Sequence, residues 1–244
     1  MNSDQLAAGA KILCDSESFV WHQRFELAPG VWTPGVNDIA WLLDAASFPN
    51  DLSGKSVLDI GTTNGAMAFE AERRGSTDVT AVDISDENHY GFRKIADLLE
   101  SNVKFRTASV YELPAVLDRT FDVVVFWGVL YHLRHPLLAL DALRQVCSDV
   151  CFLESAIYTP PYDTTDVIAK FHRLDDLAGD GTNWWSPTVE ATEAWCRSAG
   201  FDFELQQLMP PAQPERCLAK LTVIPGTPEY LRVSYERPLR AIVL

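Results

Sequence analysis

Residues Ser56 to Ser85 read "SVLDIGTTNGAMAFEAERRGSTDVTAVDIS" and contain the pattern from which the fold class is predicted. A short apolar run with β-branched residues comes first, and a glycine turn follows it. The next residues have helical spacing that closes on Gly75, and a second apolar run then ends at Asp83. This β-α-β pattern predicts two parallel strands joined by a right-handed crossover helix.

The same alternation continues along the chain. Helices are predicted at 88–100, 136–147 and 188–200, and further strands at 103–110, 121–130, 148–157, 201–209 and 217–225. The run "DVVVFW" at 122–127 is apolar without alternation, which is typical of a sheet covered on both faces. Thr188 is a plausible N-cap of the last helix, and Gly200 fits its C′ position. We therefore predict a doubly wound α/β fold with a mostly parallel, seven-stranded sheet.

Two segments depart from this alternation. Residues 1–50 are rich in aromatic side chains and contain the turn signals "APG" and "TPG", so we expect an N-terminal helical cap before a main domain at 51–244. Residues 158–187 are rich in proline, glycine and aromatic residues. They read as an insertion in the main domain, and insertions of this kind often cover a substrate.

Composition narrows the function classes. The formal net charge of −14 argues against broad attraction to nucleic acid, which normally needs a basic face. The five scattered cysteines favour neither a disulfide framework nor a zinc site, and we expect no metal. No long apolar run or leader pattern is evident, so we expect a soluble, cytoplasmic protein without a membrane partner. A homo-oligomer remains open.

The turn after the first strand reads Gly61-Thr62-Thr63-Asn64-Gly65. A dinucleotide-binding turn would read G-x-G-x-x-G, so the glycine spacing does not fit. Asp59 places a carboxylate beneath the turn, which suits a ligand with a positive centre. Asp83 lies about twenty residues beyond the turn, where an acidic side chain can accept hydrogen bonds from ribose hydroxyls.

Two segments carry a resemblance to a known family. "VLDIGTTNG" and "VTAVDI" resemble the first two motifs of class I S-adenosylmethionine-dependent methyltransferases. "FDVVVFWGVLYHLRHPLLAL" resembles the fourth-strand motif of the group that contains the tRNA wobble-uridine carboxymethyltransferases. The resemblance spans residues 54–157, with a weaker match in "NWWSP". It implies a Rossmann-like methyltransferase fold with S-adenosylmethionine as cofactor. It departs at Thr63, where the family motif D-x-G-x-G-x-G has a glycine.

The resemblance also implies positions for the cofactor contacts. The methionine part would lie among Asp59, Gly61, Asn64 and Gly65, the ribose on Asp83, the adenine on Ile84 and near Ser109 and Val110, and the sulfonium before Trp127 and Gly128. Many family members have an acidic residue where Ser109 stands. We therefore expect backbone groups to contact the adenine there.

The residues after the fourth strand offer the chemistry. A methyl group on a positive sulfur is already activated, so the protein must align the acceptor and, for a hydroxyl, remove its proton. His132 is the candidate base, because histidine titrates near neutral pH, although a structural role as a helix cap is an equal alternative. Tyr131 is expected to orient the acceptor or contact the sulfonium. Arg134 would bind an anionic acceptor or remain solvated.

The acceptor is predicted from the insertion. Trp184 and Trp185 suit a flat ring or the apolar face of a sugar, and packing within the insertion without substrate contact is the alternative. We expect methyl transfer, on oxygen, to a small metabolite such as a sugar or natural product, and consider nucleic acid unlikely. We expect ordinary S-adenosylmethionine instead of its carboxylated form, because Arg24 is the only Lys or Arg in the lead-in "WHQRFELAPGVWTPG", where the tRNA enzymes have a lysine-rich segment.

Two other functions stay open. A tRNA wobble-uridine (carboxy)methyltransferase would need a basic face, for which the candidates are Arg73, Arg74, Arg93, Arg134, Arg232, Arg237 and Arg240. A non-catalytic S-adenosylmethionine-binding protein would keep cofactor affinity without turnover.

Replacing Asp83 tests the cofactor site. Asp83→Ala should weaken S-adenosylmethionine binding by about 1 to 3 kcal/mol, because two ribose hydroxyls lose their acceptor. Isothermal titration calorimetry measures this change. An unchanged affinity would remove Asp83 from the site.

Overall fold

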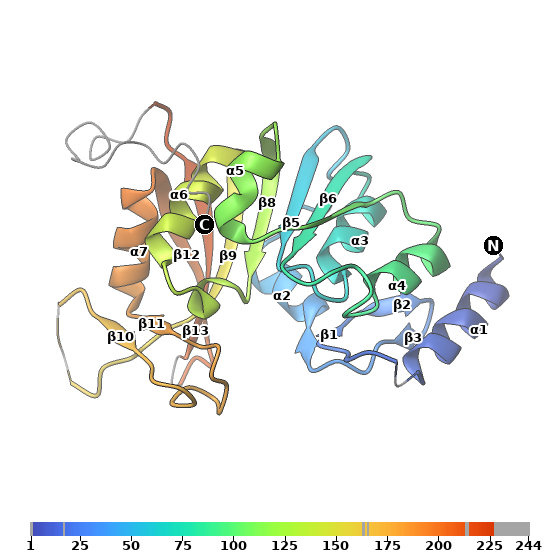
Figure 1. The fold of residues 1–244 in the computed structure, drawn as a ribbon, viewed down its shortest axis with the longest axis horizontal. Helices are drawn as coiled ribbons and strands as arrows, with labels where there is room; N and C mark the ends of the chain where they lie inside the picture. The colour runs from blue at the N-terminus through green and yellow to red at the C-terminus, as the bar shows by residue number, and fades with distance from the viewer. Residues whose placement is uncertain (1, 17, 163, 165, 213–214, 227–244) are drawn as a thin grey trace. The chain divides into compact units, whose positions relative to one another are not determined.

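The computed structural model describes residues 2–16, 18–162, 164, 166–212 and 215–226, and it divides into two compact units, residues 1–109 and 110–244 (Figure 1). The elements of the first unit are α1 (Ser3–Cys14), β1 (Gln23–Arg24), β2 (Glu26–Ala28), β3 (Val31–Trp32), β4 (Asn37–Asp38), α2 (Ile39–Ala45), β5 (Ser56–Ile60), α3 (Ala66–Arg73), β6 (Asp78–Asp83), α4 (Phe92–Leu99) and β7 (Lys104–Thr107).

The first unit is built around three parallel strands in the order β5-β6-β7. All five residues of β5 are buried, and α3 packs against both β5 and β6. Because the strands are parallel, their carboxyl ends share one edge, and the register places Asp83 beside Thr107 there. The predicted β-α-β unit is confirmed.

The N-terminal segment is helical at its two ends and extended between them. β1 pairs with β4 in parallel and β2 with β3 antiparallel. Gly30 has a φ of +75°, a conformation that glycine adopts freely, in the turn between β2 and β3. A helical cap was expected for residues 1–50, and the "APG" and "TPG" turns are the places where short strands replace helix.

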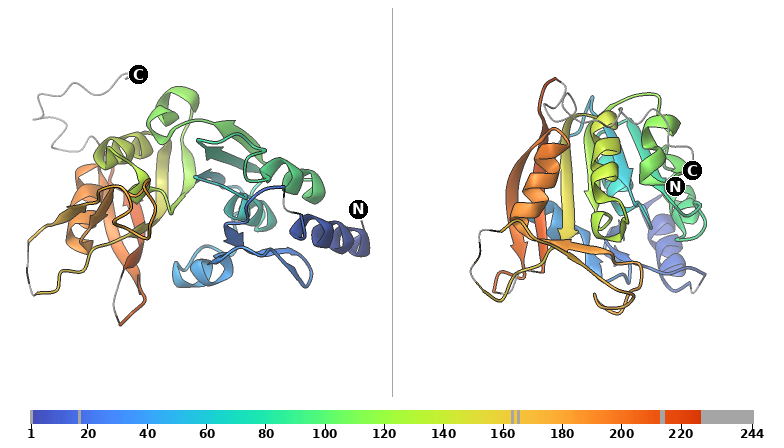
Figure 2. Two further views of the ribbon diagram at one scale, coloured as in Figure 1. Left: turned by 60° about the horizontal axis from the view of Figure 1, so that its bottom comes forward. Right: turned by 60° about the vertical axis from the view of Figure 1, so that its left-hand side comes forward.

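The second unit contains η1 (Val110–Glu112), α5 (Leu113–Val116), β8 (Phe121–Trp127), η2 (Leu130–His132), α6 (Pro136–Val146), β9 (Cys147–Ala156), β10 (Ala169–Phe171), β11 (Trp185–Pro187), α7 (Val189–Ser198), β12 (Phe201–Met209) and β13 (Arg216–Val223), where η marks a 3-10 helix. Its main strands run in the order β12-β13-β9-β8, with β8 and β9 parallel and the other pairs antiparallel. α7 packs against β12 (Figure 2). Thr188 caps α7 through Ala191 N, and Gly200 follows with a φ of +90°, as predicted.

The two units together hold the seven strands of a mostly parallel Rossmann-like sheet, so the predicted α/β fold class is confirmed. Four free cysteines, Cys147, Cys151, Cys196 and Cys217, are buried. Within the described ranges, no helix is long and apolar enough to cross a membrane. Nor do three or more His, Cys, Asp or Glu residues gather there as a metal site.

The insertion at 158–187 contains its own small sheet. β10 and β11 pair antiparallel, with Phe171 opposite Trp185. The two ends of the insertion are joined, because Tyr158 N donates to Pro187 O at 2.9 Å, and β11 contacts β9 of the main sheet. The segment is referred to below as the lid, residues 158–187, and its role over a substrate stays a prediction.

Two glycines in the first unit provide a matched test of packing. Gly65 has a φ of +89°, and a Cβ there would lie 2.4 Å from Phe69 and 2.7 Å from Phe92. Gly54 has a φ of +73° with nothing within 4 Å of such a Cβ. Gly54→Ala should cost about 1 to 2 kcal/mol of unfolding free energy, the left-handed backbone term alone.

Gly65→Ala should cost roughly 1 to 3 kcal/mol more than Gly54→Ala, since two buried aromatic rings must shift. Urea unfolding of both variants measures the difference. Equal costs would contradict the packing at Gly65.

Candidate active site

The glycine turn of the first unit has the backbone form that a close ligand requires. Gly61 and Gly65 have φ values of +73° and +89°, and Gly61 N donates to Val82 O at 2.8 Å. Thr63, which stands at the family's glycine position, also has a positive φ of +47°, an uncommon conformation for a β-branched residue. Its hydroxyl is buried without a hydrogen-bond partner. A polar ligand group could satisfy that hydroxyl, so the turn fits S-adenosylmethionine.

Asp83 holds the turn through its carboxylate. Oδ2 accepts from Thr63 N at 3.0 Å, and Oδ1 accepts from Ser85 N at 2.9 Å. Each oxygen keeps a further lone pair, so both remain able to accept ribose hydroxyls. Ile84, beside it, exposes 77% of its surface, which leaves an apolar face for an adenine ring. Ser109 is half-buried after the third strand.

Asn64 has a different place from the other turn residues. Its fully buried amide accepts from His22 N and Gln23 N, and donates to Val20 O and Tyr90 O. These four bonds use the ordinary capacity of the amide. A cofactor contact at Asn64 would therefore have to come from its backbone.

Asp59 lies buried beneath the turn, 3% exposed. Its Oδ2 accepts from Thr62 Oγ1 at 2.6 Å. Burial raises the pKa of Asp59 to about 7, against the opposing effect of the Thr62 bond, and the charge of Asp83 adds to the rise. A positive ligand would favour the charged form of this carboxyl.

The predicted catalytic residues of the second unit lie where β8 ends. Trp127 is half-buried, Gly128 turns the chain with a φ of +71°, and Tyr131 and His132 follow on η2. The rings of Tyr131 and His132 have centroids 4.2 Å apart. Burial raises the pKa of Tyr131 and lowers the pKa of His132. His132 is therefore a neutral imidazole at neutral pH.

An ion pair beside Tyr131 was not foreseen. Glu154, 4% exposed on β9, receives two hydrogen bonds from Arg216 on β13, one of them from Nη2 at 2.8 Å. The guanidinium lies over the Tyr131 ring, 4.7 Å from its centroid. Glu154 could have been found, since it is the one acidic residue in the apolar part of the 148–157 run, at a strand's carboxyl end. Arg216 could not, because its place depends on the antiparallel return of β13.

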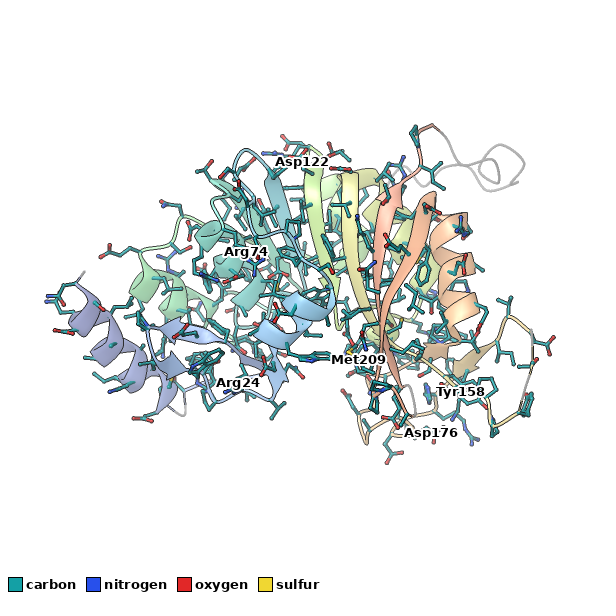
Figure 3. The ribbon with its side chains drawn as sticks, turned by 180° about the vertical axis from the view of Figure 1, so that it is seen from behind. Arg24, Arg74, Asp122, Tyr158, Asp176 and Met209 are labelled. Carbon is teal, nitrogen blue, oxygen red and sulfur yellow. The ribbon has the colours of Figure 1, made fainter. Side chains whose placement is uncertain are left out.

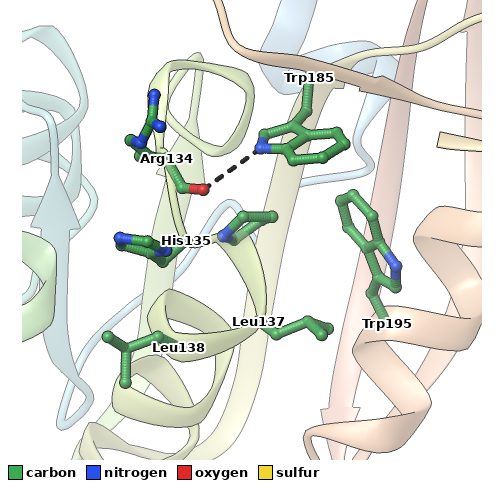
Figure 4. A pocket seen from close by; sticks show the side chains of 7 residues that line it. Arg134, His135, Leu137, Leu138, Trp185 and Trp195 are labelled. Carbon is green, nitrogen blue, oxygen red and sulfur yellow. Dashed lines mark hydrogen bonds between the residues drawn. The ribbon is translucent and has the colours of Figure 1, made fainter. Parts of the chain in front are cut away.

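The three predicted substrate residues are brought together. The Arg134 guanidinium lies 4.7 Å from the centroid of Trp184, and Trp185 Nε1 donates to Arg134 O at 3.3 Å (Figure 4). Trp184 N donates to Tyr131 O at 2.8 Å, which attaches the lid to η2. A groove of about 290 Å³ lies between Trp185, Trp195 and the first turn of α6. The lid tryptophans thus border the predicted catalytic segment.

Val110, the remaining predicted cofactor contact, is buried at the start of η1.

Asp59→Asn should change how stability depends on pH. Asp59 has a folded pKa of about 7 against the ordinary aspartate value of 3.8, so the folded state binds the extra proton between these values. The wild type therefore loses the stability from this group as pH rises from about 4 to about 7. The asparagine variant lacks this loss. Between pH 5 and pH 8 its free energy of unfolding should rise by roughly 1 to 4 kcal/mol relative to that of the wild type.

Urea unfolding of both proteins across this range measures the difference, in which the other titrating groups cancel. The same variant should bind S-adenosylmethionine more weakly relative to the neutral S-adenosylhomocysteine. A stability difference independent of pH would show that Asp59 ionises normally.

Comparison with known proteins gives the family. The protein-family model described as "Methyltransferase domain" matches residues 20–206. A tRNA U34 carboxymethyltransferase from Campylobacter hominis is 32% identical over 158 residues, 64% of this chain and 53% of the relative. One from Pseudomonas syringae pv. tomato is 32% identical over 203 residues, 77% of this chain and 61% of the relative. The chain thus spans about half to three fifths of the length of these relatives.

Solved structures share the fold. The N-terminal domain of EvdMO1 with S-adenosylhomocysteine bound has a TM-score of 0.64 at 21% identity, covering 91% of this chain and 98% of that one. Magnesium protoporphyrin IX methyltransferase from Synechocystis PCC 6803, with bound S-adenosylmethionine, has a TM-score of 0.53 at 13% identity, covering 75% and 77%. The family match supports the predicted cofactor class. Since the family match covers well over half of the sequence and the sheet and glycine turn agree with it, the chain belongs to the family of S-adenosylmethionine-dependent methyltransferase domains.

Proposed function

We propose that this chain transfers a methyl group from S-adenosylmethionine to a hydroxyl oxygen of a small acceptor, such as a sugar or natural product. The observation that carries the proposal is His132, a histidine that burial keeps neutral, immediately after Tyr131 at the end of β8. A hydroxyl must lose its proton as it attacks the methyl carbon. A neutral imidazole is the side chain suited to take that proton near pH 7.

The cofactor would be held by the first unit. Asp83 offers its carboxylate to the ribose, Thr63 has an unpaired buried hydroxyl, and Asp59 can meet a positive centre with a negative charge. S-adenosylmethionine supplies a methyl group on a positive sulfur, and the residues of this chain bind and orient it. The acceptor would be held by the second unit.

Aromatic surface supports a small ring as acceptor. Trp184 is attached to Tyr131 by a backbone hydrogen bond, and Phe171 lies 5.9 Å from Trp184 between ring centroids. Such faces suit a flat ring or the apolar face of a sugar. The N-terminal domain of EvdMO1, whose fold this chain shares at a TM-score of 0.65, has been crystallised in the presence of S-adenosylhomocysteine and D-fucose.

A tRNA acceptor is the second candidate, and the names of the curated relatives favour it over a small acceptor. The charges of the described residues oppose it. Arg73 and Arg74 both bond to Glu70, and Arg93 bonds to Asp97 within its own helix. Figure 3 labels Arg74. Arginines paired in this way attract phosphate weakly, and the chain carries a net charge of −14. Arg134 lies with its guanidinium over Trp184, and the other candidates, Arg232, Arg237 and Arg240, lie outside the described residues.

Cofactor choice and acceptor choice can be tested on the purified protein. Calorimetry with S-adenosylmethionine, S-adenosylhomocysteine and the carboxylated analogue should show weaker binding of the third, by about 1.4 kcal/mol or more, a factor of ten. Transfer of a radiolabelled methyl group should reach members of a panel of hydroxylated sugars and aromatic natural products. Bulk tRNA lacking wobble modifications should stay unlabelled.

The His132→Ala variant controls for binding alone. It should lose roughly 10²- to 10⁴-fold in turnover while its affinity for S-adenosylmethionine stays unchanged. Label in tRNA, or preference for the carboxylated analogue, would replace the small acceptor with the second candidate. Cofactor binding without transfer to either class would favour a non-catalytic role.

A further inference from the structure

Two lid residues reach the candidate base. Thr182 Oγ1 lies 2.9 Å from His132 Nδ1 and 2.7 Å from Asp180 Oδ1. The backbone N of Thr182 also donates to Asp180 Oδ1, at 2.8 Å. The three side chains therefore form a continuous path from a carboxylate through a hydroxyl to the imidazole. Neither Asp180 nor Thr182 was singled out by the sequence motifs.

The number of protons on this path fixes the direction of each hydrogen bond. A threonine hydroxyl has a single proton to donate. Asp180 accepts two bonds from Thr182, and these hold the pKa of its carboxyl below the usual value, so it is ionised and has no proton to share. The proton between the two oxygens must therefore come from Thr182. The remaining lone pair of that hydroxyl can only accept, which requires a proton on His132 Nδ1.

We propose that Asp180 and Thr182 act as positioning residues that hold His132 in its Nδ1-protonated form, which leaves Nε2 as the proton-accepting nitrogen. The Nδ1 atom of His132 lies beside the Thr182 hydroxyl, and the Thr182 backbone also bonds to the imidazole and favours its protonated form. Free histidine prefers the opposite tautomer, with the proton on Nε2. We call this path from Asp180 through Thr182 to His132 the relay. It would hold the imidazole in the tautomer in which Nε2 can accept a proton.

The neighbouring charges are compatible with a neutral ring. Asp180 favours the protonated imidazole, Arg216 opposes it, and Glu154 is paired with Arg216. Tyr131, the ring in contact with His132, has a raised pKa and stays uncharged. Burial is the largest effect and favours the neutral form. Asp180 is then the neighbour that stabilises the imidazolium once the proton arrives.

The use of this base rests on the proposed function. As the acceptor oxygen forms its bond to the methyl carbon, the carbon–sulfur bond breaks and its electron pair stays on sulfur, which becomes neutral. The acceptor's hydroxyl proton passes to His132 Nε2. The imidazolium keeps its Nδ1 proton, which it donates in a hydrogen bond to Thr182 Oγ1. It returns the Nε2 proton to solvent afterwards. No other reactant is needed.

The tautomer can be measured without any acceptor. In protein labelled with ¹⁵N-histidine, long-range NMR correlations between the ring nitrogens and the carbon-bound ring protons distinguish the two neutral tautomers. The signal that is lost in His132→Gln belongs to His132. The wild type should show the Nδ1-protonated form above the imidazole pKa. Thr182→Val removes the acceptor at an exposed position and should convert the signal to the Nε2-protonated form.

Two further variants sharpen the test. Thr182→Ser keeps the hydroxyl and should keep the wild-type tautomer. Asp180→Ala frees the Thr182 proton to be donated to Nδ1, and it should give the same switch as Thr182→Val without altering residue 182. An Nε2-protonated wild type, or a wild-type pattern retained in both Thr182→Val and Asp180→Ala, overturns the proposal.

Failure of the relay and failure of the proposed function give different results. The predicted tautomer switch without His132-dependent transfer to any hydroxyl acceptor would keep the relay and reject the function. Transfer that depends on His132 but an unchanged tautomer would reject the relay. With a working acceptor, Thr182→Val should lower kcat with KM unchanged, and Thr182→Ser should restore it.

Discussion

The buried amide of Asn64 is the constraint on which the first unit depends. It bonds to backbone groups at Val20, His22, Gln23 and Tyr90, so a single side chain joins the lead-in, the glycine turn and the loop before α4. Leaving a buried amide without its hydrogen bonds costs free energy, so separating any one of these segments from Asn64 is unfavourable. The positive φ values of Gly61, Thr63 and Gly65 are maintained inside this frame. The turn is consequently shaped before any cofactor arrives.

The second unit uses an ion pair for a comparable purpose. Glu154 is almost fully buried, and a buried carboxylate requires a partner that satisfies both of its oxygens. Arg216 bonds to both, from a strand that returns antiparallel beside β9, and it also covers the Tyr131 ring. The position of Tyr131 thus depends on residues from two strands far apart in the sequence. His132 inherits that placement because it follows Tyr131 on η2.

Local sequence signals predicted most of the fold. The β-α-β unit, the parallel pair β8 and β9, the Thr188 cap and the Gly200 terminus all follow from periodicity and turn chemistry. The short strands within residues 1–50 were missed, since runs of two or three residues carry no period. The positions of the candidate site residues at strand ends were predictable for the same reason that the strands were, while their roles stay predictions. Arg216, Asp180 and Thr182 were not, because their partners are set by tertiary contacts.

The lid also links two properties that enzymes often keep separate. Trp184 and Trp185 present its aromatic surface, and Thr182, which bonds to Asp180, contacts His132. Under the proposed function, a sequence change in this one segment would alter both the surface that faces the acceptor and the environment of the histidine. Divergence toward new acceptors would then proceed through paired substitutions in the lid, with the strand ends left as they are.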